Sequence, residues 1–315
     1  MTIITIDNMT EDSTSENQPN EGVTGADDSL VENLAVDAMT IKEESRLMTM
    51  NNKFDFDKRT LLDAVLVIES EITGLNIASF QDSLRLQQLV VKSKLASFET
   101  ANKEKLLALL DILYKQQGFT GDWKAFFKVK NALISLVFSR RKGIPISLGI
   151  LLLDFLRLSD FDAQGICFPS GFIIRVKLDN EVLYVDPFIG EIATWELLEL
   201  KVRGQMGNYA KLTLDMLKPD TNETIVKRFI NVLKAAYIQA DRTEIALLCS
   251  DILLRLDPDD AYEVRDRGFL FQQLDCLSLA RNDFEYFMQQ HPKDPMVHLL
   301  EKQIEEMDFT DQIMH

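Results

Sequence analysis

The sequence predicts an α+β domain followed by an all-α domain, and three observations support this order. Between residues 142 and 191, a Gly/Pro turn opens a strongly apolar helix, and two or three strands come after it. In the last third of the chain, particular residues recur at a spacing of 34. The length of 315 residues, at roughly 150 residues per domain, allows about two domains.

The first 50 residues differ from the rest in composition. They hold eleven Asp and Glu residues against Lys42 and Arg46, and they contain no aromatic residue. Such a segment cannot bury enough apolar surface to offset the entropy lost on ordering. We therefore expect residues 1–50 to form a disordered acidic N-terminal extension. The alternative is a short docking helix within residues 30–41 that folds on a partner.

The α+β domain is expected over residues 53–215 and should begin with three helices. Apolar residues recur there at helical spacing, and Gly118 should close the third helix. The apolar positions are Leu61, Leu62, Val65 and Ile68, then Leu84, Leu86, Leu89, Val90 and Leu95, then Leu106, Leu107, Leu109, Leu110, Leu113 and Tyr114.

Two further helices should come before the strands. Asp122 is expected to cap a short helical piece, and Asn131 should be the N-cap of a helix over residues 132–141. Gly143 and Pro145 break that helix, and Pro145 suits the first turn of the apolar helix after it.

The strands should follow the apolar helix closely. They are expected over residues 164–168, 171–178 and 181–188. Asp179 and Asn180 make a short turn between the last two strands, which indicates a hairpin. Cys167 should lie in the first strand as a buried small hydrophobe.

The C-terminal domain, residues 220–307, is expected to consist of helical repeats. The spacing of 34 is the period of the tetratricopeptide helix–turn–helix unit. The matched pairs are Pro258 with Pro292, Ala246 with Ala280, Tyr237 with Phe271, and Asp260 with Asp294. The second copy has Gly268 and Phe284 where the unit has a small and an aromatic residue, whereas the first copy has Lys234 and Ser250.

Two copies are few for a free-standing solenoid. We therefore expect them to pack on the preceding domain, with residues 295–307 as a closing helix. The alternative is a set of ordinary antiparallel helices whose spacing arises by chance.

A helix followed by strands is how a papain-like or transglutaminase-like core presents its reacting groups. Such a core needs a thiolate at the helix N-terminus, a histidine on a neighbouring strand and an Asp or Asn on the next. Ser147, Gly171 and Asp186 occupy the places that these roles require, but only Asp186 keeps the required residue type. We expect Asp186 to accept hydrogen bonds from amides at the strand end.

At these residues the chain resembles the SirB/YchA-like bacterial family, and within it the gammaproteobacterial branch. The matching segments are GIPISLGILLL, CFPSGFIIRV, YVDPFIGE and, in the repeats, LDPDDAYEVRDRGFLFQQLDCLSLARNDFEYF. The resemblance implies a transglutaminase-like domain joined to tetratricopeptide repeats over about residues 54–307. Many members carry Gly-His-Phe at residues 170–172, so the resemblance places the missing base at Gly171 and the missing cysteine at Pro145 or Ser147.

Composition and motifs exclude several classes of function. A net charge of −16 disfavours nucleic acid and anionic membrane surfaces as partners. No P-loop, GxGxxG or HExxH motif is present, and no Asp or Cys cluster completes a metal site with His291 and His298. We therefore expect no cofactor. With neither a signal peptide nor a long apolar run, a cytoplasmic location is expected.

The leading hypothesis is a cytoplasmic protein-interaction scaffold or regulator on a catalytically degenerate transglutaminase-like fold. Its protein or peptide partner would bind the repeat domain. The alternative is an amidase, protease or acyl-transfer enzyme that uses Ser147 as a non-standard nucleophile with Asp186. The sequence makes no prediction about the oligomeric state.

Overall fold

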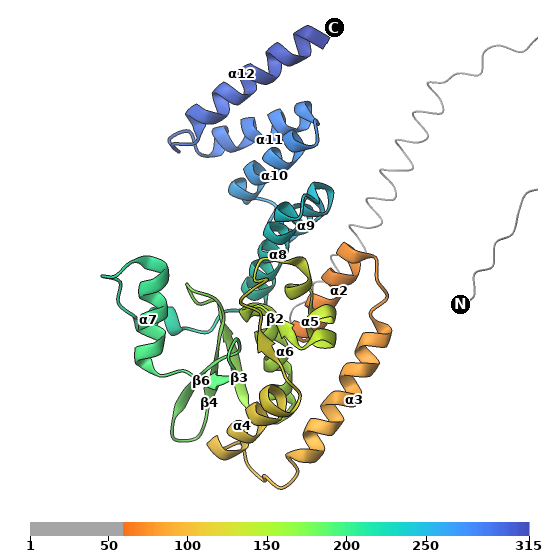
Figure 1. The fold of residues 1–315 in the computed structure, drawn as a ribbon. Helices are drawn as coiled ribbons and strands as arrows, with labels where there is room; N and C mark the ends of the chain where they lie inside the picture. Colours follow the sequence, from red (N-terminus) through yellow and green to blue (C-terminus); the bar gives the residue numbers. More distant parts are fainter. Residues whose placement is uncertain (1–58, 315) are drawn as a thin grey trace, which may run out of the picture. The chain divides into compact units, whose positions relative to one another are not determined.

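The computed structural model describes residues 59–314, with side chains to residue 307. The prediction for residues 1–50 lies outside this range. The helices before the sheet are α2 (Leu61–Thr73), α3 (Ala78–Lys94) and α4 (Lys103–Leu110), and the π-helix η1 (Asp111–Gln116) continues α4 (Figure 1). Gly118, with φ +79°, follows η1 as expected.

Helix α3 differs from its predicted apolar face. Its buried apolar residues are Leu84 and Val91, whereas Leu86, Leu89 and Val90 are exposed. The helical periodicity is present, but only the face of α3 that carries Leu84 and Val91 packs against the core.

A parallel pair of two-residue strands, β1 (Thr120–Gly121) and β2 (Lys142–Gly143), brackets the next helices. Between them lie η2 (Val129–Asn131) and α5 (Ile134–Arg140). The expected helical piece after Asp122 is a set of turns, in which the Asp122 carboxylate accepts a hydrogen bond from Ala125 N at 3.1 Å.

The prediction that Asn131 caps the following helix is wrong. Asn131 lies in η2, where its side chain donates to Ala125 O and accepts from Arg140. The first turn of α5 is capped instead by Glu69 of α2, whose carboxylate accepts from Ile134 N at 2.6 Å and from Ser135 N at 3.1 Å. The cap therefore comes from a residue distant in the sequence.

Helix α6 (Pro145–Leu158) starts at proline as predicted and leads into the sheet. The sheet consists of β3 (Asp162–Ile166), β4 (Ile173–Lys177), β5 (Val182–Asp186) and β6 (Glu191–Ile192), antiparallel and in that order. The predicted β4–β5 hairpin is confirmed. Cys167 lies one residue beyond β3 rather than within it.

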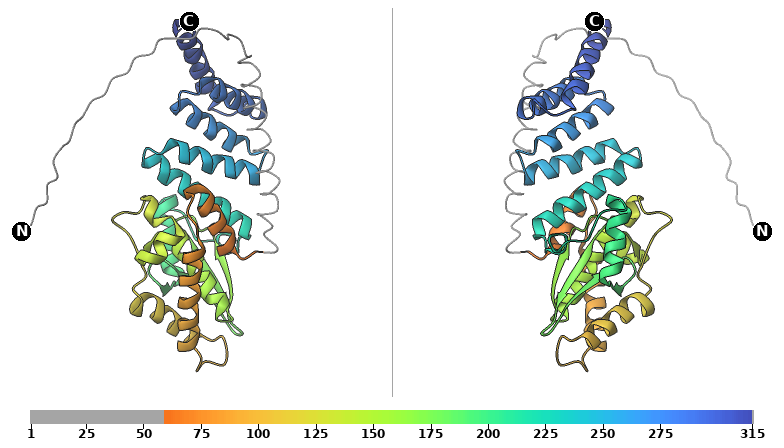
Figure 2. Two further views of the ribbon diagram at one scale, coloured as in Figure 1. Left: turned by 90° about the vertical axis from the view of Figure 1, so that its right-hand side faces the viewer. Right: turned by 90° about the vertical axis from the view of Figure 1, so that its left-hand side faces the viewer.

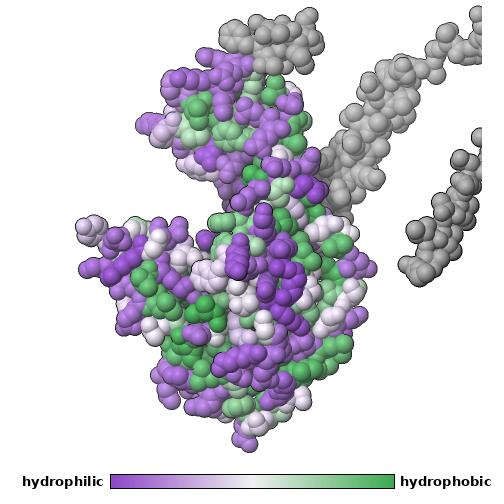
Figure 3. Space-filling model, in the orientation of Figure 1, coloured by the Kyte–Doolittle hydropathy of each residue, from purple (hydrophilic) through white to green (hydrophobic). Residues whose placement is uncertain are grey.

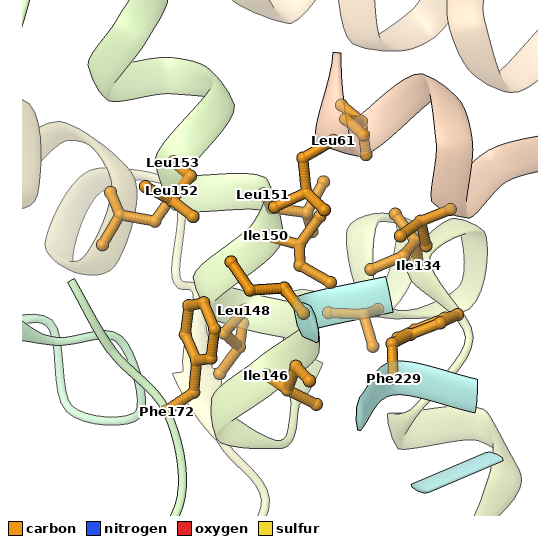
Figure 4. Packing of buried hydrophobic residues seen from close by; sticks show 14 of the residues in the cluster. Leu61, Ile134, Ile146, Leu148, Ile150, Leu151, Leu152, Leu153, Phe172 and Phe229 are labelled. Atoms are coloured by element: carbon orange, nitrogen blue, oxygen red, sulfur yellow. The ribbon is translucent and has the colours of Figure 1, made fainter. Parts of the chain in front are cut away.

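The two faces of the sheet contact different cores. On one face, Ile174 and Val185 join the main hydrophobic cluster with α6. Figure 4 shows this cluster around α6; its labelled members are Leu61, Ile134, Ile146, Leu148, Ile150, Leu151, Leu152, Leu153, Phe172 and Phe229. On the other face, Ile173 and Tyr184 pack with α7 (Trp195–Met206). Alternating strand residues thus divide between α6 and α7.

The remaining chain is helical apart from its connecting turns. After the short helix η3 (Leu214–Leu217) come α8 (Asn222–Gln239), α9 (Thr243–Leu256), α10 (Ala261–Gln273), α11 (Leu277–Gln290) and α12 (Val297–Met314) (Figure 2). Apolar residues of α8 and α9 belong to the cluster that holds α2 and α6. The repeats therefore pack on the preceding domain, as expected, and α12 is the closing helix.

The register of the repeat is confirmed by its second copy. A Cβ atom added to Gly268 would lie 2.6 Å from the ring of Phe284, so only glycine allows this approach of α10 to α11. In the first copy, Lys234 and Ser250 stand at these positions, and both bind the buried carboxylate of Glu263. A polar cluster there takes the place of the glycine–aromatic contact.

Candidate functional site

Ser147, one candidate nucleophile, lies in the first turn of α6 and is fully buried. Its hydroxyl donates a hydrogen bond to the carbonyl oxygen of Ala132 at 2.8 Å. This bond ties the start of α6 to the residue after η2. No solvent reaches this oxygen.

Gly171, at the position of the base, lies directly against Pro145. A Cβ atom on Gly171 would be 3.3 Å from both Cβ and Cγ of Pro145. The φ of Gly171 is +153°, a value that residues with a side chain rarely adopt. Of the two candidate positions for the missing cysteine, the structure brings Pro145 beside Gly171.

Asp186 ends β5 with its side chain on the α7 face of the sheet. Its Oδ1 accepts a hydrogen bond from Phe188 N at 2.9 Å, and its Oδ2 lies 2.8 Å from Lys201 Nζ on α7. The expected bond from a strand-end amide is therefore present. Burial raises the pKa of the nearby Tyr114, and the charge of Asp186 raises it further.

The three candidate residues do not converge. Ser147 is enclosed beneath the helix start, Gly171 faces Pro145, and Asp186 points toward α7. The histidines with described side chains, His291 and His298, belong to the repeats, and His291 packs against the Tyr262 ring at 4.8 Å. Among the described residues, no histidine stands within this site.

Metal and thiol chemistry have little support at the site. The described part of the chain contains no cluster of three His, Cys, Asp or Glu residues that could hold a metal ion. Burial raises the pKa of Cys167 and of Cys249 to about 12, which leaves little thiolate at neutral pH. Cys276 is exposed but lies in the repeats.

A pocket of about 400 Å³ opens where Pro145 and Gly171 meet. Its walls come from the start of α6, the loop between β3 and β4, the segment before η2, and α8. Most of the lining is apolar. The polar side chains in the lining are those of Lys128, Ser170, Gln205 and Arg228, and no Asp or Glu of the described chain joins them.

Two features mark the polar part of this lining. The hydroxyl oxygen of Ser170 is buried and has no hydrogen-bond partner among the described residues. The first turn of α6 has no side-chain cap, and its N-terminal amides have no partner within the helix. The N-terminus of α6 therefore keeps its positive partial charge, although Pro145 stands where that charge would stabilise a thiolate.

Sequence reasoning missed the pocket residues contributed by α8 and by the segment before η2. On α8, Arg228 is followed by Val232, Ala235 and Ala236, a stripe at helical spacing that faces the pocket. Such a stripe is visible in the sequence. The sequence does not show that this stripe lines the same pocket as Lys128, which lies far earlier in the chain.

Comparisons with known proteins agree with this architecture. A family model described as "Transglutaminase-like superfamily" matches residues 81–231, and one described as "Tetratricopeptide repeat" matches residues 233–305. A UPF0162 protein of Vibrio cholerae is 37% identical over 264 residues, covering 82% of this chain and 96% of that protein. The predicted combination of domains is confirmed.

Two further relatives carry other names. Protein SirB1 of Salmonella typhimurium is 29% identical over 265 residues, and UPF0162 protein YchA of Escherichia coli is 28% identical over 265 residues. Each match covers 83% of this chain and 98% of the relative. No solved structure matches the chain.

Proposed function

Since the chain belongs to the UPF0162 family, with SirB1 and YchA among its relatives, we propose that it is a protein-interaction scaffold or regulator without triad chemistry. Its tetratricopeptide repeats fit a protein-interaction role. The transglutaminase-like domain would then serve as a second binding surface rather than as a catalyst.

The contact between Gly171 and Pro145 carries this proposal. A thiol-type core needs a nucleophile and a proton acceptor in hydrogen-bond reach of each other. At this place the chain offers a glycine, which has no side chain, and a proline, which has no nucleophilic atom. What remains is a pocket that can bind a ligand but lacks the thiol and the base of a triad.

The alternative enzyme would depend on Ser147 and Asp186. The burial of Ser147, its bond to Ala132 O and the orientation of Asp186 toward Lys201 all count against it. Activation of a serine requires a base that can take its proton, and Ala132 O is only an acceptor from a hydroxyl that stays protonated.

We also propose a cytoplasmic protein that acts without a cofactor and that binds neither nucleic acid nor membrane. The net charge of −16 supports the absence of polyanionic partners. Within residues 59–314, no helix combines the length and the apolarity that a bilayer-spanning segment requires.

The test of the chemistry uses purified full-length protein. Amidase, protease and transamidation assays should show no turnover, and a fluorophosphonate probe should leave Ser147 unlabelled. Turnover that is lost in Ser147→Ala but kept in Ser139→Ala, a matched change at an exposed serine, would establish the enzyme instead.

The test of the binding role uses the same protein as bait, followed by titration of each captured protein in purified form. Exposed apolar side chains of the repeat helices, Leu279 and Leu299, should contribute to affinity, so their replacement by alanine should weaken binding. Leu75→Ala, at a similarly exposed position outside the repeats, is the control. Equal affinity of all three variants would place the interface elsewhere.

A further inference from the structure

We propose that the pocket beside Pro145 and Gly171 binds an extended segment of a partner protein in which acidic side chains alternate with apolar ones. This inference rests on the proposed interaction role and names the chemistry of the partner. The pocket has the size of a ligand site, about 400 Å³, and most of its lining is apolar. An apolar side chain entering it would be removed from water, which favours binding.

Two positive charges in the pocket lining favour an anionic occupant. The ammonium of Lys128 and the guanidinium of Arg228 make no ion pair with any residue that the structure describes. Both line an apolar pocket to which no Asp or Glu of the described chain contributes. Two cations without carboxylates at the edge of an apolar pocket are complementary to an anionic, partly apolar ligand.

The rim of the pocket extends the contact area beyond a small molecule. Phe127 lines the pocket and is 67% exposed. Trp123 lies outside the lining, is 72% exposed, and is linked to the lining residue Phe126 through Phe188. Both are held by ring contacts, since Trp123 packs edge-on against Phe188 at 4.3 Å and Phe127 against Phe126 at 5.1 Å. Exposed aromatic side chains on a fixed support are typical of protein–protein contact sites.

The surface of the transglutaminase-like domain agrees with a binding role. Figure 3 shows apolar residues gathered over the region of α7 and the sheet, whereas the repeat helices present mostly hydrophilic residues in this view. Trp195, Leu200 and Met206 of α7 are exposed, and Gln205 of the same helix lines the pocket.

The two cations come from different walls, Lys128 from the segment before η2 and Arg228 from α8. A free chain end brings a single main-chain carboxylate for the two cations. An internal segment with acidic residues at several positions can meet both, while its apolar residues enter the pocket and contact the aromatic rim. We therefore assign the occupant to an internal acidic–apolar segment.

The test measures fluorescence anisotropy of the full chain with a labelled peptide of alternating Leu and Glu, blocked at both ends. Arg228→Ala should weaken binding by about 10-fold or more, and Lys128→Ala by about 3- to 10-fold, because charge-assisted hydrogen bonds are lost. Lys124→Ala removes one positive charge from an exposed side chain outside the pocket lining and should change affinity by less than about 2-fold. A peptide with Gln in place of Glu should bind about 10-fold more weakly.

Four results would overturn the inference: no binding up to about 1 mM peptide, equal affinity for the Gln peptide, equal loss in Arg228→Ala and Lys124→Ala, or binding that needs a free C-terminal carboxylate. The melting temperature of each variant is measured as well, to check that the variant is folded. Failure here is distinguishable from failure of the proposed function, because the latter appears as Ser147-dependent turnover. A partner that still binds Arg228→Ala would sink this inference while leaving the interaction role intact.

Discussion

The buried carboxylate of Asp186 and the partly exposed ammonium of Lys201 form an ion pair across the α7 face of the sheet. Lys201 Nζ lies 2.8 Å from Asp186 Oδ2, and Asp186 is only 2% exposed. The second oxygen accepts the amide of Phe188, which shapes the turn after β5. The residue that would orient a base therefore links a strand end to a helix.

Asp186 should be structural rather than catalytic. Asp186→Asn keeps the shape and one acceptor, so we expect a loss of about 1–2 kcal/mol. Asp186→Leu should lose about 3–5 kcal/mol, because it leaves the Lys201 ammonium half-buried without a partner. Chemical denaturation of both variants checks the order. A stable Asp186→Asn protein that has lost a measurable activity would contradict the structural interpretation.

Gly268→Trp should destabilise the repeats. Even a Cβ atom meets the Phe284 ring at 2.6 Å, so a large side chain must separate α10 from α11 at a cost of about 1–3 kcal/mol or more. Gly204→Ala is the matched control, since nothing lies within 4 Å of a Cβ atom there and alanine favours a helix. An unchanged melting temperature for Gly268→Trp would show that the repeat register is wrong.

The stability of the chain should depend on pH through Glu69. Burial raises the pKa of this carboxyl above its ordinary value of 4.5, while its bonds to Ser135 and Ile134 oppose the shift. The folded chain therefore holds the proton more tightly than the unfolded chain does. The stability that the more tightly held proton contributes is complete below pH 4.5 and declines as the pH rises through the higher pKa of the folded state.

The measurement compares the wild type with Glu69→Gln, which cannot titrate. The melting temperature of the wild type relative to Glu69→Gln should fall as the pH rises from 4.5. Glu104→Gln, at an exposed position of α4, is the matched control for the substitution itself. If the melting temperature of the wild type rose relative to that of Glu69→Gln as the pH increased, the hydrogen bonds to α5 would affect the pKa of Glu69 more than burial does, and the prediction would be wrong.

Alkylation should distinguish the three cysteines. Iodoacetamide at neutral pH should label Cys276, which is exposed, well before Cys167 and Cys249, whose thiol pKa values burial raises to about 12. Peptide mapping by mass spectrometry gives the order, and Cys276→Ser should remove the fast phase. Rapid labelling of Cys167 would indicate an activated thiol beside the sheet.

Local rules predicted much of the fold from the sequence. Proline begins α6, the Asp-Asn turn joins β4 to β5, and the spacing of Gly268 and Phe284 marks the second repeat. Each of these depends on backbone preferences or on residues one or two helices apart. The places of the candidate site residues were predictable too, but their side-chain directions were not.

The sequence by itself determined that the chain lacks a histidine before the repeats, that an α+β domain precedes helical repeats, and where the strands and the long apolar helix lie. Only the tertiary structure decided that Glu69 caps α5, that Asp186 faces Lys201, and that Lys128 meets Arg228 around one pocket. Capping, periodicity and turn preferences act within a few residues of the chain. The partners of a buried carboxylate or the walls of a pocket depend on which surfaces pack together, and packing joins residues that are far apart in the sequence.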